Sequence, residues 1–181
     1  MDKHTYKEGI IGNCAYLAHV NVDTNVTWLC WPRFDSSFVF GGLMDKEKGG
    51  EFSILPAGEY TSKQYYRENT NVLCTEITNS EGSYRITDFA PRFHQFDRFF
   101  KPLMLIRKIE VLQGLPRIKV ICKPTYDYGS STLEPVRGSN HIEYFGSGAK
   151  IRLTTNIPVS YILDGHYFIL SENSYLLLTY G

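Results

Sequence analysis

The sequence predicts an all-β fold built as an antiparallel sandwich. Nearly every segment alternates apolar and polar residues with period two, which is typical of half-buried strands. Turn residues recur about every ten positions, a spacing that favours a sandwich over βαβ units. Aromatic residues make up 14% of the chain, and together with well-spread β-branched residues they favour strands over helices.

The first strands lie in the N-terminal fifth of the chain. Strands are expected over residues 15–20 and 27–31. Pro32 ends the second strand because proline cannot donate to a sheet ladder and biases Trp31 toward extended backbone. One helical turn is expected over residues 37–44, before the charged turn at 45–50, and no amphipathic helix of normal length is expected anywhere.

The middle of the chain contains a hairpin and two long strands. Strands are expected over 51–55 and 60–66, and those over 71–78 and 83–89 flank a bend that contains Gly82. A strand over 103–111 has an apolar face that Arg107 interrupts. In the next one, over 117–123, Ile118, Val120 and Cys122 point one way while Arg117, Lys119 and Lys123 point the other, which indicates a half-buried antiparallel strand.

Five further strands are expected toward the C-terminus, over residues 142–145, 150–154, 159–163, 166–170 and 175–180. Turns at 138–140, 146–148 and 164–165 separate them. A chain of 181 residues fits a single domain spanning 1–181. Because the last strand is apolar and has no polar tail, we expect the domain to be excised from a longer protein.

The composition bears on partners and location. Nineteen basic and nineteen acidic side chains cancel, so we expect neither nucleic acid nor an anionic membrane as a partner. No apolar run approaches the roughly 20 residues that span a bilayer. Residues 1–5 are polar and lack the apolar segment of a secretory signal, from which we expect a cytoplasmic protein.

No metal or cofactor is expected. The five histidines are scattered without the spacing of a metal site. The four cysteines, Cys14, Cys30, Cys74 and Cys122, form no local pairs and lie among strand-like residues. We expect them to be small core residues with free thiols, although two disulfides remain an alternative.

The segment from Trp31 to Asp35 is the first candidate site. Arg33, Phe34 and Asp35 leave the predicted strand together on a loop beside Trp31. An aromatic face next to a bidentate donor and a carboxylate suits the apolar faces and hydroxyl rims of sugars. The alternative is that both tryptophans, Trp28 and Trp31, lie at the edge of the core beside a local Arg33–Asp35 salt bridge.

A second strand end repeats this arrangement. Asp88 and Arg92 lie within a few residues of each other around Pro91, on a loop next to aromatic residues. The alternative is that Asp88 pairs with Arg92 across its own turn or caps that turn. Residues 92–100 form an aromatic and charged loop, in which His94 is either exposed at a partner surface or an ordinary loop residue.

Four segments, taken in order, carry a resemblance to a known family: Gly9-Ile10-Ile11-Gly12-Asn13-Cys14-Ala15, Trp28-Leu29-Cys30-Trp31-Pro32-Arg33-Phe34-Asp35-Ser36, Gly49-Gly50-Glu51-Phe52 and Thr87-Asp88-Phe89-Ala90-Pro91-Arg92. They resemble the N-terminal domain of bacterial glucoamylase-like and trehalase-like proteins of glycoside hydrolase family fifteen. One departure is at residues 21–26, where the family usually has a glycine-containing tight turn.

The resemblance implies a large sandwich of the supersandwich type, joined to a C-terminal barrel of paired α-helices. It also implies an inverting reaction, in which an acid protonates the glycosidic oxygen and a base activates water. The catalytic glutamates of the family lie in the barrel, so no residue of this chain is expected to be catalytic. The implied partners are that barrel, in the same polypeptide, and a glucoside substrate at a shared pocket.

Within this resemblance, six residues are candidates for the domain interface or the pocket rim: Trp31, Arg33, Phe34, Asp35, Asp88 and Arg92. The leading hypothesis is a non-catalytic domain that holds the loops of the barrel in place. One alternative is a free-standing carbohydrate-binding sandwich, which would need a solvent-facing aromatic strip on one sheet. The other is a self-sufficient enzyme, which would need two carboxylates facing one cleft.

Overall fold

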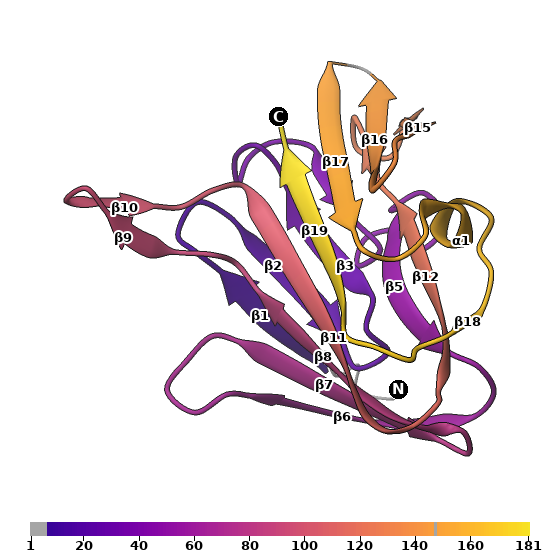
Figure 1. Ribbon diagram of the computed structural model, residues 1–181. Coiled ribbons are helices and arrows are strands. Elements are labelled where there is room, and N and C mark those ends of the chain that lie inside the picture. The colour runs from indigo at the N-terminus through magenta and orange to yellow at the C-terminus, as the bar shows by residue number, and fades with distance from the viewer. Residues whose placement is uncertain (1–6, 147) are drawn as a thin grey trace, which may run out of the picture.

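The computed structural model describes residues 7–146 and 148–181 and shows antiparallel sheets stacked in two layers (Figure 1). The prediction of an all-β sandwich is confirmed. The N-terminal residues 1–6, on which the expectation of a missing secretory signal depends, lie outside the described residues. Ser147, in the middle of the predicted turn at 146–148, also lies outside them.

One layer is an eight-stranded sheet that runs across the whole molecule. Every neighbouring pair in it is antiparallel. From one edge to the other its strands are β15 (Glu134–Arg137), β16 (His141–Gly146), β17 (Ala149–Thr155), β19 (Ser174–Tyr180), β11 (Met104–Gly114), β8 (Gly82–Phe89), β7 (Leu73–Asn79) and β6 (Tyr60–Tyr66).

The second layer consists of two smaller sheets. The four-stranded sheet contains β1 (Glu8–Gly12), β2 (Leu17–Asn21), β3 (Val26–Cys30) and β4 (Phe38–Phe40), in that order. The three-stranded sheet contains β18 (Phe168–Ile169), β12 (Arg117–Lys123) and β5 (Glu51–Pro56). Outside the layers are two ribbons and one helix, namely β9 (Phe93–Gln95) with β10 (Arg98–Phe100), β13 (Thr125–Tyr126) with β14 (Ser131–Thr132), and α1 (Val159–Leu163).

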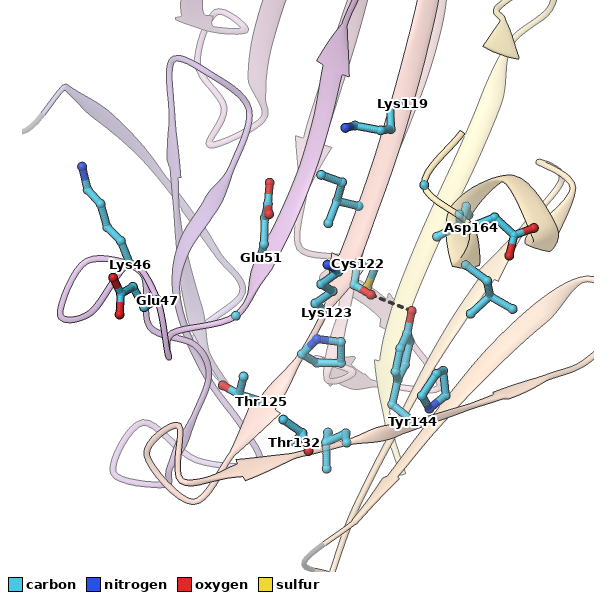
Figure 2. Close-up of a pocket in the computed structure, with 18 residues that line it drawn as sticks. Lys46, Glu47, Glu51, Lys119, Cys122, Lys123, Thr125, Thr132, Tyr144 and Asp164 are labelled. Carbon is cyan, nitrogen blue, oxygen red and sulfur yellow. Dashed lines mark hydrogen bonds between the residues drawn. The ribbon is translucent and has the colours of Figure 1, made fainter. Parts of the chain in front are cut away.

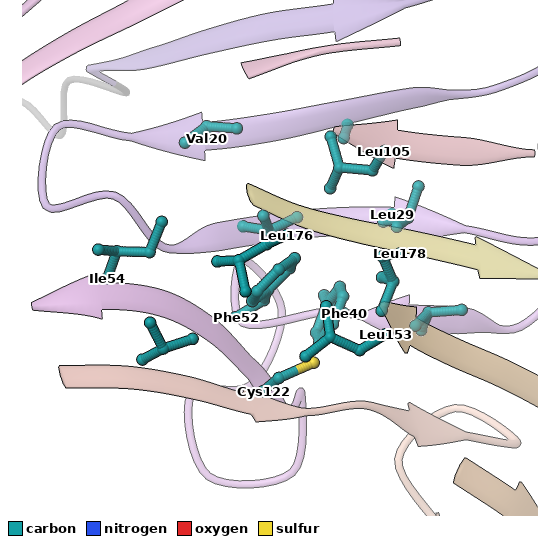
Figure 3. Packing of buried hydrophobic residues seen from close by; sticks show 14 of the residues in the cluster. Val20, Leu29, Phe40, Phe52, Ile54, Leu105, Cys122, Leu153, Leu176 and Leu178 are labelled. Carbon is teal, nitrogen blue, oxygen red and sulfur yellow. The ribbon is translucent and has the colours of Figure 1, made fainter. Parts of the chain in front are cut away.

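A continuous apolar core lies between the two layers (Figure 3). Strand β12 shows how the sequence builds it, since Ile118, Val120 and Cys122 are buried while the residues that alternate with them are not, namely Arg117, Lys119, Ile121 and Lys123. Phe40 and Phe52 stack at the centre with ring centroids 5.8 Å apart. Burying one such side chain stabilises the fold by about 1.5–3 kcal/mol, so the alternation is sufficient to specify which face turns inward.

The predicted hairpin with a bend at Gly82 is confirmed, and it joins β7 to β8. The Asn79 side chain accepts hydrogen bonds from the backbone N–H groups of Glu81 and Gly82, at 2.9 and 3.1 Å. Gly82 has φ +152°, and a Cβ there would lie 2.2 Å from the carbonyl oxygen of Gln113. Only glycine therefore fits where this bend touches β11.

The turn between β2 and β3 forms without glycine. Thr24 takes the left-handed conformation with φ +70°. Its hydroxyl donates to the carbonyl of Ile54 and accepts from the Ile54 N–H, both at 2.9 Å. The Asn21 side chain closes the turn by accepting from the Asn25 N–H at 2.9 Å. These contacts hold Thr24 in a left-handed backbone conformation that residues other than glycine rarely adopt.

Two element predictions are wrong. Residues 159–163 form helix α1 instead of a strand, because Val159 and Ile162 are buried three positions apart, as on one helix face. Residues 37–44 contain strand β4, and only their end, after Gly41, turns. The strand expected over 166–170 is shorter than predicted, and β1, β9, β10, β13, β14 and β15 were not foreseen.

The cysteines are all free, as expected, but one is not in the core. Cys30, Cys74 and Cys122 are buried, and burial raises the pKa of the Cys122 thiol to about 12. Cys14 is exposed on the loop after β1, with φ +70°. The expectation of a core position for Cys14 is therefore wrong. Within the described part of the chain, no helix is long and apolar enough to cross a membrane.

Candidate functional site at one end of the sandwich

Four separate parts of the chain meet at one end of the sandwich. They are residues 13–16, residues 31–36, the β9–β10 hairpin with its flanks (residues 91–102), and the end of β19 at Tyr180; we call them together the end face. The Asn13 amide donates to the carbonyls of Pro91 and Pro102, at 2.9 and 2.8 Å. The Tyr180 N–H donates to the carbonyl of Leu103 at 3.1 Å.

Trp31 lies beneath the end face instead of on it. Its side chain is fully buried, and its ring packs against Tyr16 and Tyr180 with centroids 5.3 and 6.3 Å apart. Its Nε1 has no hydrogen-bond partner among the described residues. Burial raises the pKa of Tyr16, whose hydroxyl donates to the carbonyl of Met104. Trp31 therefore supports the surface loops from within and offers no face to a ligand in this chain.

The three residues that follow Pro32 are exposed. The Arg33 Nη2 and Asp35 Oδ2 form an ion pair of 2.9 Å, and their side chains are 76% and 69% exposed. Phe34 between them is 55% exposed. A turn holds them, in which the Ser36 N–H donates to the Arg33 carbonyl and the Arg33 N–H donates to the Ser36 hydroxyl. The local salt bridge considered from the sequence is thus present, on a surface that a partner can reach.

Arg92 lies on the exposed root of the β9–β10 hairpin. Its Nη1 donates to the Cys14 sulfur at 3.1 Å, and its guanidinium carbon lies 4.9 Å from the centroid of the Phe99 ring. It does not pair with Asp88, which was one alternative. Next to it, residues 12–14, 70–72 and 89–93 line a groove of 580 Å³.

Asp88 is placed in the core. Its carboxylate is 1% exposed and accepts from Arg107, with Oδ1 2.9 Å from the Arg107 Nε. Arg107 also donates to the backbone carbonyls of Phe52 and Thr24 and lies over the Phe52 ring at 4.8 Å. Complete burial raises the pKa of Asp88, and the neighbouring guanidinium opposes part of that rise. This position differs from the surface location expected from the sequence.

Sequence reasoning missed Arg107 as the partner of Asp88. The signal was present, because an arginine that interrupts the apolar face of a strand needs a buried acceptor. Antiparallel pairing of β8 with β11 places Asp88 directly opposite Arg107. Asn13 and Tyr16 were also missed as braces of the end face, and no local pattern in the sequence marks them.

The lining of a second groove contains none of the six predicted residues. Figure 2 shows this groove from close by. Its volume is 640 Å³, and it is bounded by β5, β12, the turn after β4 and the end of α1. The Tyr144 hydroxyl beneath it donates to the Cys122 carbonyl at 2.9 Å. Three lysines balance three carboxylates in the lining, which comprises Lys46, Lys119, Lys123, Glu47, Glu51 and Asp164. We assign no acid or base there.

The end face presents groups of several chemical kinds to solvent. It offers an exposed guanidinium, a carboxylate and aromatic rings, the groups that contact hydroxyl-rich ligands and protein surfaces. Among residues 7–146 and 148–181, no group of three or more His, Cys, Asp or Glu side chains is arranged to hold a metal ion.

The fold and the end face define an all-β sandwich domain with an exposed charged and aromatic surface at one end. The family described as "Trehalase-like, N-terminal" matches residues 4–163. This chain therefore belongs to the trehalase-like N-terminal domain family. No solved structure gives a significant match to it.

Curated relatives share the sequence over part of their length. The chain is 36% identical to a trehalase of Thermoplasma volcanium over 67% of this chain and 20% of the relative. It is 36% identical to a trehalase of Thermoplasma acidophilum over 58% of this chain and 18% of the relative. It is 29% identical to "Trehalase 2" of Sulfolobus acidocaldarius over 87% of this chain and 25% of the relative. The matches thus take in a quarter or less of these relatives.

Proposed function

We propose that this chain is the non-catalytic N-terminal domain of an inverting α-glucoside hydrolase of the trehalase or glucoamylase type. In this proposal the domain supports a catalytic barrel in the same polypeptide, and its end face contributes to the domain interface or the rim of the substrate pocket. The observation that carries the proposal is the match to the trehalase-like N-terminal family over residues 4–163.

The lengths of the relatives support the proposed partner. The trehalases of both Thermoplasma species are about five times longer than their matched regions, because those regions are 20% and 18% of each protein. The unmatched part is long enough to hold a separate catalytic domain. We therefore place the chemistry in that part and assign no catalytic residue here.

The position of the last strand supports the choice of the end face. Tyr180 ends β19 beside the root of the hairpin, where its N–H donates to the Leu103 carbonyl. A domain that follows β19 would begin beside the root of the hairpin and close to Trp31, whose ring contacts Tyr180 and which lies just before Arg33, Phe34 and Asp35 in the chain. Short connections keep consecutive parts of a chain adjacent, so these exposed groups are within reach of such a domain.

The six candidate residues take two roles in this proposal. Arg33, Phe34, Asp35 and Arg92 are exposed and are proposed to contact the barrel or the sugar. Trp31 and Asp88 are buried, and we propose that they act indirectly, by holding the loops that carry the exposed groups. Arg33 is the strongest candidate because, among the described residues, its guanidinium pairs with Asp35 alone and keeps further N–H groups for other hydrogen bonds.

The test of the exposed loop is Arg33→Ala in the full-length enzyme. We expect kcat/KM for the glucoside to fall about tenfold, which corresponds to about 1.4 kcal/mol, close to the lower end of what a charged hydrogen bond contributes. Arg137→Ala, at another exposed arginine on edge strand β15, is the control and should leave kcat/KM unchanged. Unchanged activity together with an unchanged melting temperature of R33A would refute a role at the interface or pocket.

The test of the division of labour compares the 181-residue chain with the full-length protein. We expect hydrolysis of trehalose or maltooligosaccharides only by the full-length protein, and no heat of binding when these sugars are titrated into the 181-residue chain. Hydrolysis by the 181-residue chain would overturn the non-catalytic assignment. Sugar binding without hydrolysis would favour a free-standing carbohydrate-binding module instead.

A further inference from the structure

The β9–β10 hairpin projects from the end face as a two-stranded ribbon (Figure 1). Each strand has three residues, and all six side chains are exposed. Phe96 and Asp97 form the bend with positive φ, and Phe96 is 86% exposed. An isolated two-stranded ribbon is at best marginally stable in water, so this one is a candidate for an element completed by a partner.

Both faces of the ribbon are aromatic. The register pairs Phe93 with Phe100 and His94 with Phe99, and side chains of successive residues point to opposite faces. The Phe93 and Phe100 rings stack on one face with centroids 5.6 Å apart. On the other face the His94 and Phe99 rings meet edge to face at 5.3 Å. A ribbon that is aromatic on both sides suits a groove that encloses it, because contact with a flat surface would cover one side only.

The charge of the hairpin restricts the kind of groove. Residues 91–101 contain three permanent cations, Arg92, Arg98 and Lys101, against a single carboxylate, Asp97. The chain as a whole has no net charge, so this excess of two positive charges is local. Electrostatic complementarity therefore favours an apolar groove with an acidic rim.

The position of the hairpin indicates where such a groove lies. The Asn13 side chain and the N–H of Tyr180 bind the two flanks of the hairpin, through the carbonyls of Pro91, Pro102 and Leu103. The base of the hairpin is therefore rigid and adjacent to the end of β19. A domain that follows β19 would begin beside the hairpin, whereas a second copy would have to reach it from outside.

We propose that the β9–β10 hairpin is an arm that inserts into an acidic-rimmed apolar groove of the catalytic domain in the same polypeptide. This inference rests on the proposed function, since it needs that domain. The exposed phenylalanines bury their rings in the groove, and Arg92, Arg98 and Lys101 face carboxylates at its rim. The arm thereby fixes the orientation of the catalytic domain relative to the end face.

The test places a photo-crosslinking benzoylphenylalanine at position 96 of the full-length protein, and separately at position 34. Mixing unlabelled and isotopically labelled protein distinguishes crosslinks within one chain from crosslinks between copies. We expect position 96 to crosslink to residues beyond 181 of its own chain. The probe at position 34 reports on the proposed domain contact without involving the arm.

The other outcomes separate the two proposals. A crosslink from position 96 to a second copy, or none from position 96 while position 34 reaches residues beyond 181, overturns the arm and leaves the proposed domain contact intact. Failure at both positions overturns both.

A second measurement uses trypsin cleavage after Arg98 in the full-length protein. In the double variant Phe96→Ser and Phe99→Ser, cleavage should be at least about tenfold faster than in the unaltered protein, because docking protects the arm in proportion to its closed population. The control is Leu115→Ser, at an exposed leucine outside the end face, which should leave the cleavage rate unchanged. Equal rates for the double variant and the unaltered protein would overturn the docked arm.

Discussion

Two Arg–Asp pairs in this molecule have the same chemistry and opposite surroundings. Asp88 with Arg107 and Asp35 with Arg33 both have a closest N–O distance of 2.9 Å. The side chains of the first pair are 1% and 0% exposed, and those of the second 69% and 76%. Both aspartates were candidates for the same surface site, yet only one is at the surface.

The difference shows that burial decides what such a pair does. Arg107 joins three strands and a turn, because it bonds Asp88 on β8 and the carbonyls of Phe52 on β5 and Thr24 before β3. Because both side chains are buried, neither the guanidinium of Arg107 nor the carboxylate of Asp88 can exchange its partner for water. Arg33 and Asp35 face solvent, so their ion pair contributes little to stability and is available to a binding partner.

The largest expected effect is at the buried pair. Arg107→Met leaves Asp88 without a counter-charge in the core, which costs about 3–5 kcal/mol. Urea unfolding of the 181-residue chain measures it. If the free energy of unfolding falls by less than about 1 kcal/mol, the buried pair contributes no more than an exposed pair does, and the two sites do not differ as argued.

A double variant tests whether the cost comes from the unpaired charge. Asp88→Leu combined with Arg107→Met removes both charges and leaves an apolar contact. We expect this variant to be more stable than Arg107→Met alone by at least about 1 kcal/mol, although the carbonyls of Thr24 and Phe52 still lose their donor. If the double variant is less stable than Arg107→Met alone, the loss of stability in Arg107→Met comes from packing and not from the unpaired charge.

A half-buried pair lies between the two extremes. Glu76 accepts from Arg85 at 2.7 Å and from the Tyr65 hydroxyl at 2.8 Å. These bonds hold the pKa of Glu76 below its ordinary value, with Arg85 the larger cause. The resulting stabilisation is therefore complete above the ordinary pKa and is lost as the pH falls through the lowered one.

Glu76→Gln should accordingly lower the free energy of unfolding at neutral pH by less than about 1 kcal/mol. The difference from the unaltered chain should vanish in acid, where Glu76 is protonated in both the folded and the unfolded state. Urea titrations across the acidic range provide the measurement. Glu134→Gln on exposed strand β15 is the control, and a pH-independent difference for Glu76→Gln would contradict this reasoning.

The smallest expected effect is at the exposed pair. Arg33→Ala should change the free energy of unfolding of the 181-residue chain by no more than about 0.5 kcal/mol. Thermal unfolding of this chain provides the measurement. A loss above about 2 kcal/mol would mean that the loop is a structural element, and the pair would then no longer contrast with Asp88 and Arg107.

Most strands could be predicted because alternation is a local property. The buried positions Ile118, Val120 and Cys122 of β12 follow directly from period two, and the Asn79–Gly82 bend follows from its turn residues. Helix α1 was mistaken for a strand because an apolar segment of five residues fits either period. Strand β4 was missed because it has three residues, all buried, and shows no alternation.

The candidate site was predictable in part. That Arg33, Phe34 and Asp35 lie on a loop follows from Pro32, which stops the strand. The place of Asp88 does not follow from its neighbours, since its partner lies 19 positions away on the adjacent strand. The hairpin residues 92–100 were recognised as aromatic and charged, but their projection from the end face depends on how Asn13 and Tyr180 hold the base.

The amino-acid sequence by itself determined most of the strands, most of the turns and the family, because these depend on alternation, on proline and glycine geometry, and on short motifs in order. The tertiary structure alone decided that Asp88 and Trp31 are internal while Arg33 and Arg92 are exposed. Burial depends on which strand pairs with which, and that pairing joins residues far apart in the chain. Two arginine–aspartate pairs with the same local chemistry therefore came to have different roles.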